Sequence, residues 1–201
     1  MRTRWPRRRG RHPVDLFRVA RRTACLGLTA GLALTACSGA PGHGPAPPEG
    51  FTEVRAGGLA YGVPAGWVAV EPPSERAEAW EGLHELRDGD RPVAEVGVIT
   101  AFGDVADARE LAFESLSLVR FETRAAPPQR DPGFEVPGAA DSERGDYHYE
   151  HPDGRSGQVR GVDIAVVLEG GDGVVLRLTG LTDHLGEEEL EEIVSSVRVP
   201  G

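Results

Sequence analysis

Two histidines and a carboxylate fall within four residues of the chain, in the segment His148-Tyr149-Glu150-His151. Imidazole nitrogens and carboxylate oxygens are ligands that zinc accepts, but structural zinc sites normally have four of them in a tetrahedral arrangement. The surrounding pattern predicts a β-strand, in which successive side chains point to opposite faces, so His148 and Glu150 share a face that His151 does not. We therefore predict polar residues at a hairpin end, no metal site and no cofactor.

A hydrolase would need a nucleophile with a base in reach, and the candidate nucleophile is Ser156 in Gly154-Arg155-Ser156-Gly157. This segment lacks the Gly-x-Ser-x-Gly spacing and the strand-to-helix turn that expose such a serine. The histidines available as bases are His84, His148, His151 and His184. We predict that the protein is not an enzyme, and we keep an uncharacterised envelope hydrolase as the alternative. A serine or aspartate hydrogen-bonded to His84, His148 or His184 in a deep pocket would favour that alternative.

Acidic residues dominate the chain from residue 37 onward, where 13 arginines stand against 31 aspartates and glutamates, a net charge of −18. Such a surface repels nucleic acid, whose binding depends on clustered cations that release counterions from phosphate. The densest acidic group is Asp183, Glu187, Glu188, Glu189, Glu191 and Glu192. Its glutamates fall on a predicted helix, where we expect a solvated face and not the carbonyl-rich loop that calcium prefers. Nucleic acid is thus excluded as a partner.

The first forty residues have the order of an export signal, with an arginine-rich start, an uncharged run over residues 24–36 and then a cysteine. The run is shorter than the roughly 20 apolar residues of a membrane-spanning helix and suits a signal peptide. It ends in Leu34-Thr35-Ala36-Cys37, which resembles the bacterial lipobox. The resemblance implies that Cys37 is diacylated and becomes the first mature residue. Arg21-Arg22 precedes the run, so general secretory and twin-arginine export both stay open, as does a start downstream of Met1.

Residues 1–36 are accordingly predicted as a lipoprotein signal peptide that is removed, with Cys37 as the lipid attachment site. Residues 37–50 are predicted as the lipidated cysteine and a tether, because residues 38–50 contain four prolines and four glycines. Cys25 lies in the removed segment and Cys37 carries lipid, so no disulfide remains. Residues 51–201 are predicted as a single α+β domain, since about 150 residues can bury a core without covalent links.

Apolar and β-branched residues between glycine and proline turns predict an antiparallel sheet in this domain. The expected strands lie in residues 51–70 (two or three short ones), 80–86, 93–102, 139–150, 158–168 and 174–181. Asp88-Gly89-Asp90 separates the members of a predicted hairpin. The last three strands follow one another with short turns and predict a meander.

Two segments predict helices, because their apolar residues recur every three or four positions. The first covers residues 107–121, with Asp104 or Asp107 as its cap. The second covers residues 186–197 and has an apolar stripe opposite its glutamates. We expect Leu111, Leu116 and Val119 of the first helix to pack on the sheet. The sheet residues expected beneath them are Val96, Val98, Ile164, Val166 and Val175.

This succession includes the turn Val63-Pro64-Ala65-Gly66-Trp67 and ends in a helix that runs into Ser195-Ser196-Val197-Arg198-Val199, and it resembles a PsbP-like domain. With the lipobox it resembles, more narrowly, the actinobacterial LpqN/LpqT-type lipoproteins, and the absence of lysine suits a GC-rich genome. The resemblance covers residues 51–199. It implies an α/β/α sandwich around an antiparallel sheet and an accessory or binding role, and it assigns no functional residue.

The sequence therefore predicts a membrane-anchored, extracytoplasmic lipoprotein that acts as a non-enzymatic binding or accessory protein of the cell envelope. Its expected partners are the membrane, through the lipid on Cys37, and either an envelope protein or a small apolar ligand.

Overall fold

The computed structural model describes residues 46–152 and 157–201. The predicted signal peptide, the lipid attachment site Cys37 and the candidate nucleophile Ser156 lie outside these residues. Within the described part, no helix has both the length and the apolar character needed to cross a bilayer. A backbone hydrogen bond reaches from the domain back into the predicted tether, since the Phe51 N–H donates to the Pro48 carbonyl at 3.1 Å.

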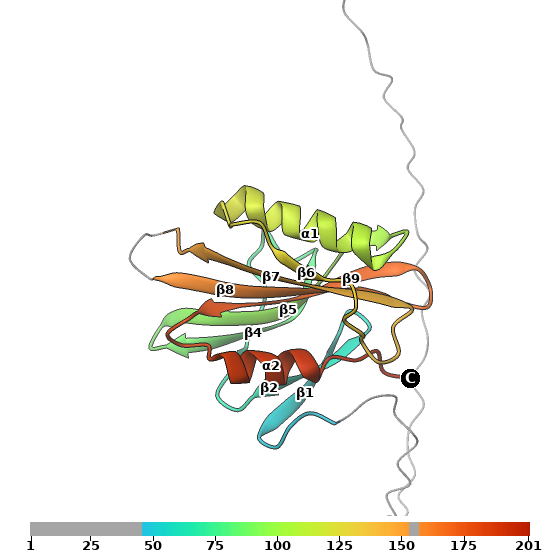
Figure 1. The fold of residues 1–201 in the computed structure, drawn as a ribbon. Coiled ribbons are helices and arrows are strands. Elements are labelled where there is room, and N and C mark those ends of the chain that lie inside the picture. The colour runs from blue at the N-terminus through green and yellow to red at the C-terminus, as the bar shows by residue number, and fades with distance from the viewer. Residues whose placement is uncertain (1–45, 153–156) are drawn as a thin grey trace, which may run out of the picture. The chain divides into compact units, whose positions relative to one another are not determined.

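Seven strands form one wholly antiparallel sheet, the central layer of the fold (Figure 1). In spatial order they are β3 (Val68–Ala69), β4 (Trp80–Asp88), β5 (Arg91–Asp104), β9 (Asp172–Leu181), β8 (Gln158–Val167), β7 (Asp141–Glu150) and β6 (Gln129–Asp131). The β4–β5 hairpin and the β7–β8–β9 meander confirm the predicted order. The two edge strands are short, with two residues in β3 and three in β6, so they offer little free backbone to another sheet.

A helix covers one face of the sheet, and a helix with a hairpin covers the other (Figure 1). The first is α1 (Ala108–Thr123), which contacts β7, β8 and β9. The opposite layer consists of α2 (Glu187–Ser195) and the antiparallel pair β1 (Phe51–Ala56) and β2 (Leu59–Pro64). The predicted α+β class, with an antiparallel sheet between helical layers, is therefore confirmed.

The start of α1 is fixed by two aspartates. Asp107 is the N-cap, and its carboxylate accepts a hydrogen bond from the Glu110 N–H at 2.8 Å. Asp141 of β7 accepts a hydrogen bond from the Ala108 N–H at 2.8 Å, which ties the first turn to the sheet. The helix ends at Arg124, whose φ of 59° places it in the left-handed conformation. Of the two caps that the sequence allowed, the structure uses Asp107.

Both faces of the sheet are buried, and the two cores hold different residues. The cluster beneath α1 contains Leu111, Leu116, Val119, Trp80, Ile99, Ala165 and Val175. The opposite cluster contains Val96, Val98, Ile164 and Val166 together with residues of α2 and the β1–β2 pair. Our expectation that these four residues lie beneath α1 is wrong, and only Val175 was placed correctly. Because β8 is buried continuously from Gly161 to Val167, its apolar pattern does not say which alternate set faces α1.

Candidate functional site

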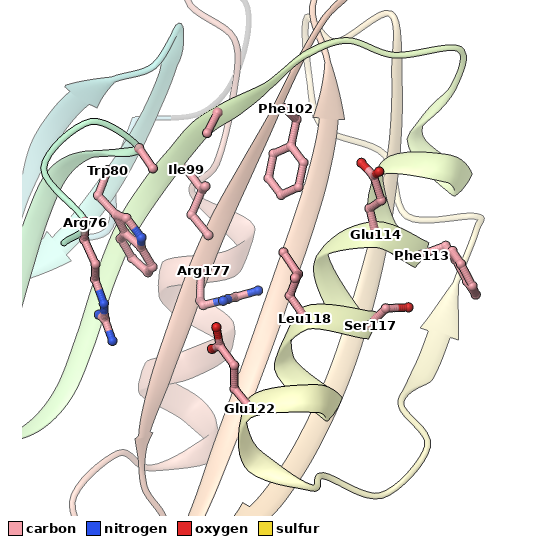
Figure 2. Close-up of a pocket in the computed structure, with 12 residues that line it drawn as sticks. Arg76, Trp80, Ile99, Phe102, Phe113, Glu114, Ser117, Leu118, Glu122 and Arg177 are labelled. Carbon is pink, nitrogen blue, oxygen red and sulfur yellow. The ribbon is translucent and has the colours of Figure 1, made fainter. Parts of the chain in front are cut away.

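A groove of about 660 Å³ lies between α1 and the strands β4 and β5 (Figure 2). We call it the α1 groove. The residues that define it are Trp80, Ile99, Phe102, Leu118, Glu122 and Arg177. Figure 2 shows Leu118 and Glu122 on α1 facing Trp80 and Ile99 across the groove, with Arg177 between them. Its volume lies in the range of about 300–1,000 Å³ that is typical of ligand-binding sites.

The helix beside the groove exposes large apolar side chains. Phe113 is 65% exposed, Leu118 51% and Phe121 87%, and the other exposed large hydrophobic residue among those described is Val68. Phe113 and Leu118 line the groove, whereas Phe121 is not part of its lining. Single exposed hydrophobic residues are common, but three on one helix next to an apolar groove are typical of a binding surface.

Beneath the α1 groove, a buried ion pair joins β8 to β9. Asp163, 1% exposed, accepts hydrogen bonds from Arg177 Nε at 2.8 Å and Arg177 Nη2 at 2.6 Å. The Ser115 hydroxyl of α1 donates to the same carboxylate at 2.5 Å, and the Tyr147 hydroxyl of β7 donates to it at 3.1 Å. This network holds α1 against three strands of the sheet.

The protonation states of the network are fixed by its surroundings. Burial alone would lower the pKa of Arg177, but the charge of Asp163 and its hydrogen bond, together with the neighbouring Tyr147 and Glu122, raise the pKa of Arg177 above its ordinary value. Burial, and then the charge of Asp163, raises the pKa of Tyr147 well above its usual value. Arg177 therefore stays charged and Tyr147 stays neutral at physiological pH. The two residues support the groove without acting as an acid or a base there.

Arg76 lies at one end of the α1 groove. Its guanidinium lies 5.2 Å from the centre of the Trp80 ring and forms an ion pair with Glu95 at 3.1 Å. Beyond Arg76, a smaller hollow of about 220 Å³ continues over the same face of the sheet, lined in part by Glu95, Tyr149 and Thr179. The two hollows are thus neighbours that share Arg76 as a lining residue.

The histidines considered in the sequence are spread over the domain. His148 lines a hollow beside α2, whereas His151 lines the smaller hollow on the α1 side, so the two imidazoles are separated as the strand pattern predicted. His84 Nδ1 lies 2.8 Å from the Gly82 carbonyl oxygen. Among residues 46–152 and 157–201, no serine or aspartate hydrogen-bonds to His84, His148 or His184, and no group of three or more possible ligands could hold a metal ion.

The hollow beside α2, about 600 Å³ in volume, has several charged residues in its lining and is spanned by its own ion pairs. Arg144 pairs with Asp146 at 2.7 Å and with Glu191 at 2.5 Å. The hydrogen bond from Arg144 lowers the pKa of Glu191 below its usual value. Glu191 is thus tied to the sheet, although the sequence predicted a solvated face for it. Because its charges are paired internally, this hollow is a weaker candidate for binding than the α1 groove.

The residues of the α1 groove were not singled out from the sequence. One signal was available, since Phe113, Leu118 and Phe121 are large apolar residues outside the buried stripe of an amphipathic helix. The partners of this helix face come from β4, β5 and β9, which no local pattern connects with it.

No protein-family model and no curated protein matches the chain. Among solved structures it is similar to the Ran-binding protein Mog1p of Saccharomyces cerevisiae, with 17% identity, a TM-score of 0.47 and coverage of 74% of this chain and 95% of that one. It is also similar to cyanobacterial PsbP (CyanoP) of Synechocystis sp. PCC 6803, with 13% identity, a TM-score of 0.49 and coverage of 75% and 92%. These likenesses assign no partner and no residue role to this chain, and the resemblance to LpqN/LpqT-type lipoproteins stays a prediction.

Proposed function

We propose that the protein is a membrane-anchored, extracytoplasmic lipoprotein that binds another protein of the cell envelope through the α1 groove, without catalysis. The observation that carries the binding role is the exposure of Phe113, Leu118 and Phe121 beside a groove of about 660 Å³. Removing apolar and aromatic side chains from water is the main favourable contribution to protein association. A partner that covers this surface would be held chiefly by these residues.

A protein partner fits this surface better than a small apolar ligand does. A small ligand would occupy the groove and leave Phe121, 87% exposed and outside the groove lining, in water. The face of a protein partner can cover the groove and the helix together. The small ligand was the other option that the sequence left open.

The lipobox at Cys37 supports the anchoring half of the proposal. The part of the chain from residue 37 onward has 13 arginines against 31 acidic residues, so an anionic bilayer repels it. Retention at the membrane therefore needs a covalent anchor, and two or more acyl chains hold a protein firmly where one does so only marginally.

A site-specific crosslink in intact cells tests the binding site. The photoreactive residue p-benzoylphenylalanine replaces Phe113, and irradiation is expected to give one discrete protein adduct that Leu118→Ser weakens in the same chain. Val68, 48% exposed on the edge strand β3, is the control position for the same photoreactive residue. An identical adduct from position 68, or an adduct from position 113 that Leu118→Ser leaves unchanged, would show that the α1 groove is not the binding site.

A further inference from the structure

The α1 groove contains more negative charge than its own arginines neutralise. Arg76 forms an ion pair with Glu95, and Arg177 forms a bidentate ion pair with Asp163, so each cation already has a carboxylate partner. Glu122 lines the groove and forms no ion pair with any described residue. Its charge acts on Arg177 at longer range, but Arg177 is already paired with Asp163, so the three groups together stay negative. An unpaired carboxylate at the wall of an apolar groove attracts a cation.

The helix α1 places a second carboxylate without an ion pair among the described residues, that of Glu114, on the same wall of the groove. Glu114, Leu118 and Glu122 are spaced four residues apart on α1, so their side chains follow one another along the helix. Glu114 also lacks an ion pair within the described part of the chain. Figure 2 shows Glu122 reaching into the groove beside Arg177, with Glu114 near the other end by Phe102. The wall is thus apolar at its centre and negative at both ends.

An elongated occupant fits this geometry better than a compact one. The smaller hollow of about 220 Å³ that includes Tyr149 and Thr179 adjoins the α1 groove at Arg76, a residue that lines both. A second copy of this chain is a poor occupant, because its 31 acidic residues against 13 arginines from residue 37 onward would be repelled. Both observations favour an extended segment of a different, basic partner.

We infer that the α1 groove receives a segment of the partner protein that carries apolar side chains flanked by lysine or arginine, with one cation placed at Glu122. The inference rests on the proposed function and specifies the chemistry of the partner. Apolar side chains of the segment lie against Trp80, Ile99 and Leu118, while the cation pairs with Glu122, which forms no ion pair with any described residue.

Calorimetric titration with three synthetic peptides tests the inference. The twelve-residue peptides share leucine and phenylalanine positions and differ only at two sites, which hold lysine, glutamine or glutamate. The full-length protein is held in phosphatidylcholine nanodiscs, with empty nanodiscs as the blank. We expect the lysine peptide to bind most tightly. Glu122→Gln should weaken its binding about threefold to fivefold, as for a solvent-accessible ion pair, and leave the glutamine peptide unchanged.

Two further variants separate failure of this inference from failure of the proposed function. Glu188→Gln removes the same charge from an exposed position on α2 and should leave all three affinities unchanged. Leu118→Ser should weaken every peptide that uses the groove. Equal affinities that still depend on Leu118 would overturn the cation at Glu122 and keep the groove as the binding site. Affinities that Leu118→Ser leaves unchanged would overturn both the cation at Glu122 and the groove as the binding site. No binding of any peptide up to about 1 mM would overturn the inference and leave the proposed function standing.

Discussion

Asp163 is a buried charge whose environment compensates it completely. Its carboxylate is 1% exposed and accepts hydrogen bonds from Arg177, Ser115 and Tyr147. Burying an ion is unfavourable by several kcal/mol, and its partners must offset that penalty through charge and hydrogen bonds. The arrangement is therefore sensitive to the loss of either charge, even though the ion pair as a whole contributes little net stability.

Removing the charge of Asp163 should therefore lower the stability of the domain. Asp163→Asn keeps the shape of the side chain but leaves Arg177 without a compensating charge, and we expect the free energy of unfolding to fall by about 3–5 kcal/mol. Urea unfolding followed by circular dichroism measures the change. Glu188→Ala, at an exposed position on α2, is the control and should change stability by no more than about 0.5 kcal/mol. Similar losses in the two variants would contradict a supporting role for the network.

The three tyrosines of the chain should make the folded domain less stable at alkaline pH. Burial raises the pKa of Tyr61, Tyr147 and Tyr149 above the ordinary value of 10. The unfolded chain therefore releases phenolic protons at a lower pH than the folded chain does. The free energy of unfolding gains no pH dependence from these groups below about pH 10 and falls as the pH rises above it.

Absorbance of the phenolate at 295 nm checks this expectation directly. At pH 10.5 the folded protein should show less phenolate than the same sample in denaturant, where all three side chains become accessible. Ordinary tyrosine titration in the folded protein, near pH 10, would contradict the burial of these hydroxyl groups.

At the scale of the elements, α1 was predictable because its signals are local. The stripe of Leu111, Leu116 and Val119 and the cap at Asp107 all lie within one continuous segment of the chain, and the structure confirms the helix within two residues at its end. The short strand β6 was missed. It has three residues, none fully buried, and is defined only by its pairing with β7.

Two leucines on α1 test its orientation. Leu116 is 3% exposed and packs so closely on β7 that a Cβ atom at Gly145 would lie 2.5 Å from Leu116 Cδ1. Leu116→Asp would place a charge in this contact and should unfold the domain. Leu118→Asp, on the exposed side of the same helix, should shift the melting temperature by only a few degrees. Thermal melts in which the two variants are equally harmful would show that the buried face of α1 is assigned wrongly.

At the scale of the whole molecule, the candidate site was not predictable from local patterns. Trp80, Phe102 and Arg177 reach the α1 groove from three different strands. Their approach depends on the strand order, in which β9 lies beside β5 although α1 and three strands separate the two in the chain. The same uncertainty led to the wrong face for Val96 and Ile164. Sequence periodicity identifies buried residues, but tertiary pairing decides which face they occupy.

The charge of the domain and the proposed anchor lead to the last prediction, which concerns Cys37. Each acyl methylene buried in a bilayer contributes about 0.8 kcal/mol, and one chain alone gives marginal binding. The net charge of −18 from residue 37 onward adds repulsion from anionic lipid, so the acyl chains must supply the whole attachment. We expect Cys37→Ser to abolish lipid labelling and either to release the domain into the medium or to leave the signal uncleaved. Fractionation and intact-mass measurement check this, with Cys25→Ser as the control that keeps the lipid. A wild-type protein without acyl mass, or with a mature N-terminus other than Cys37, would rule out the anchor.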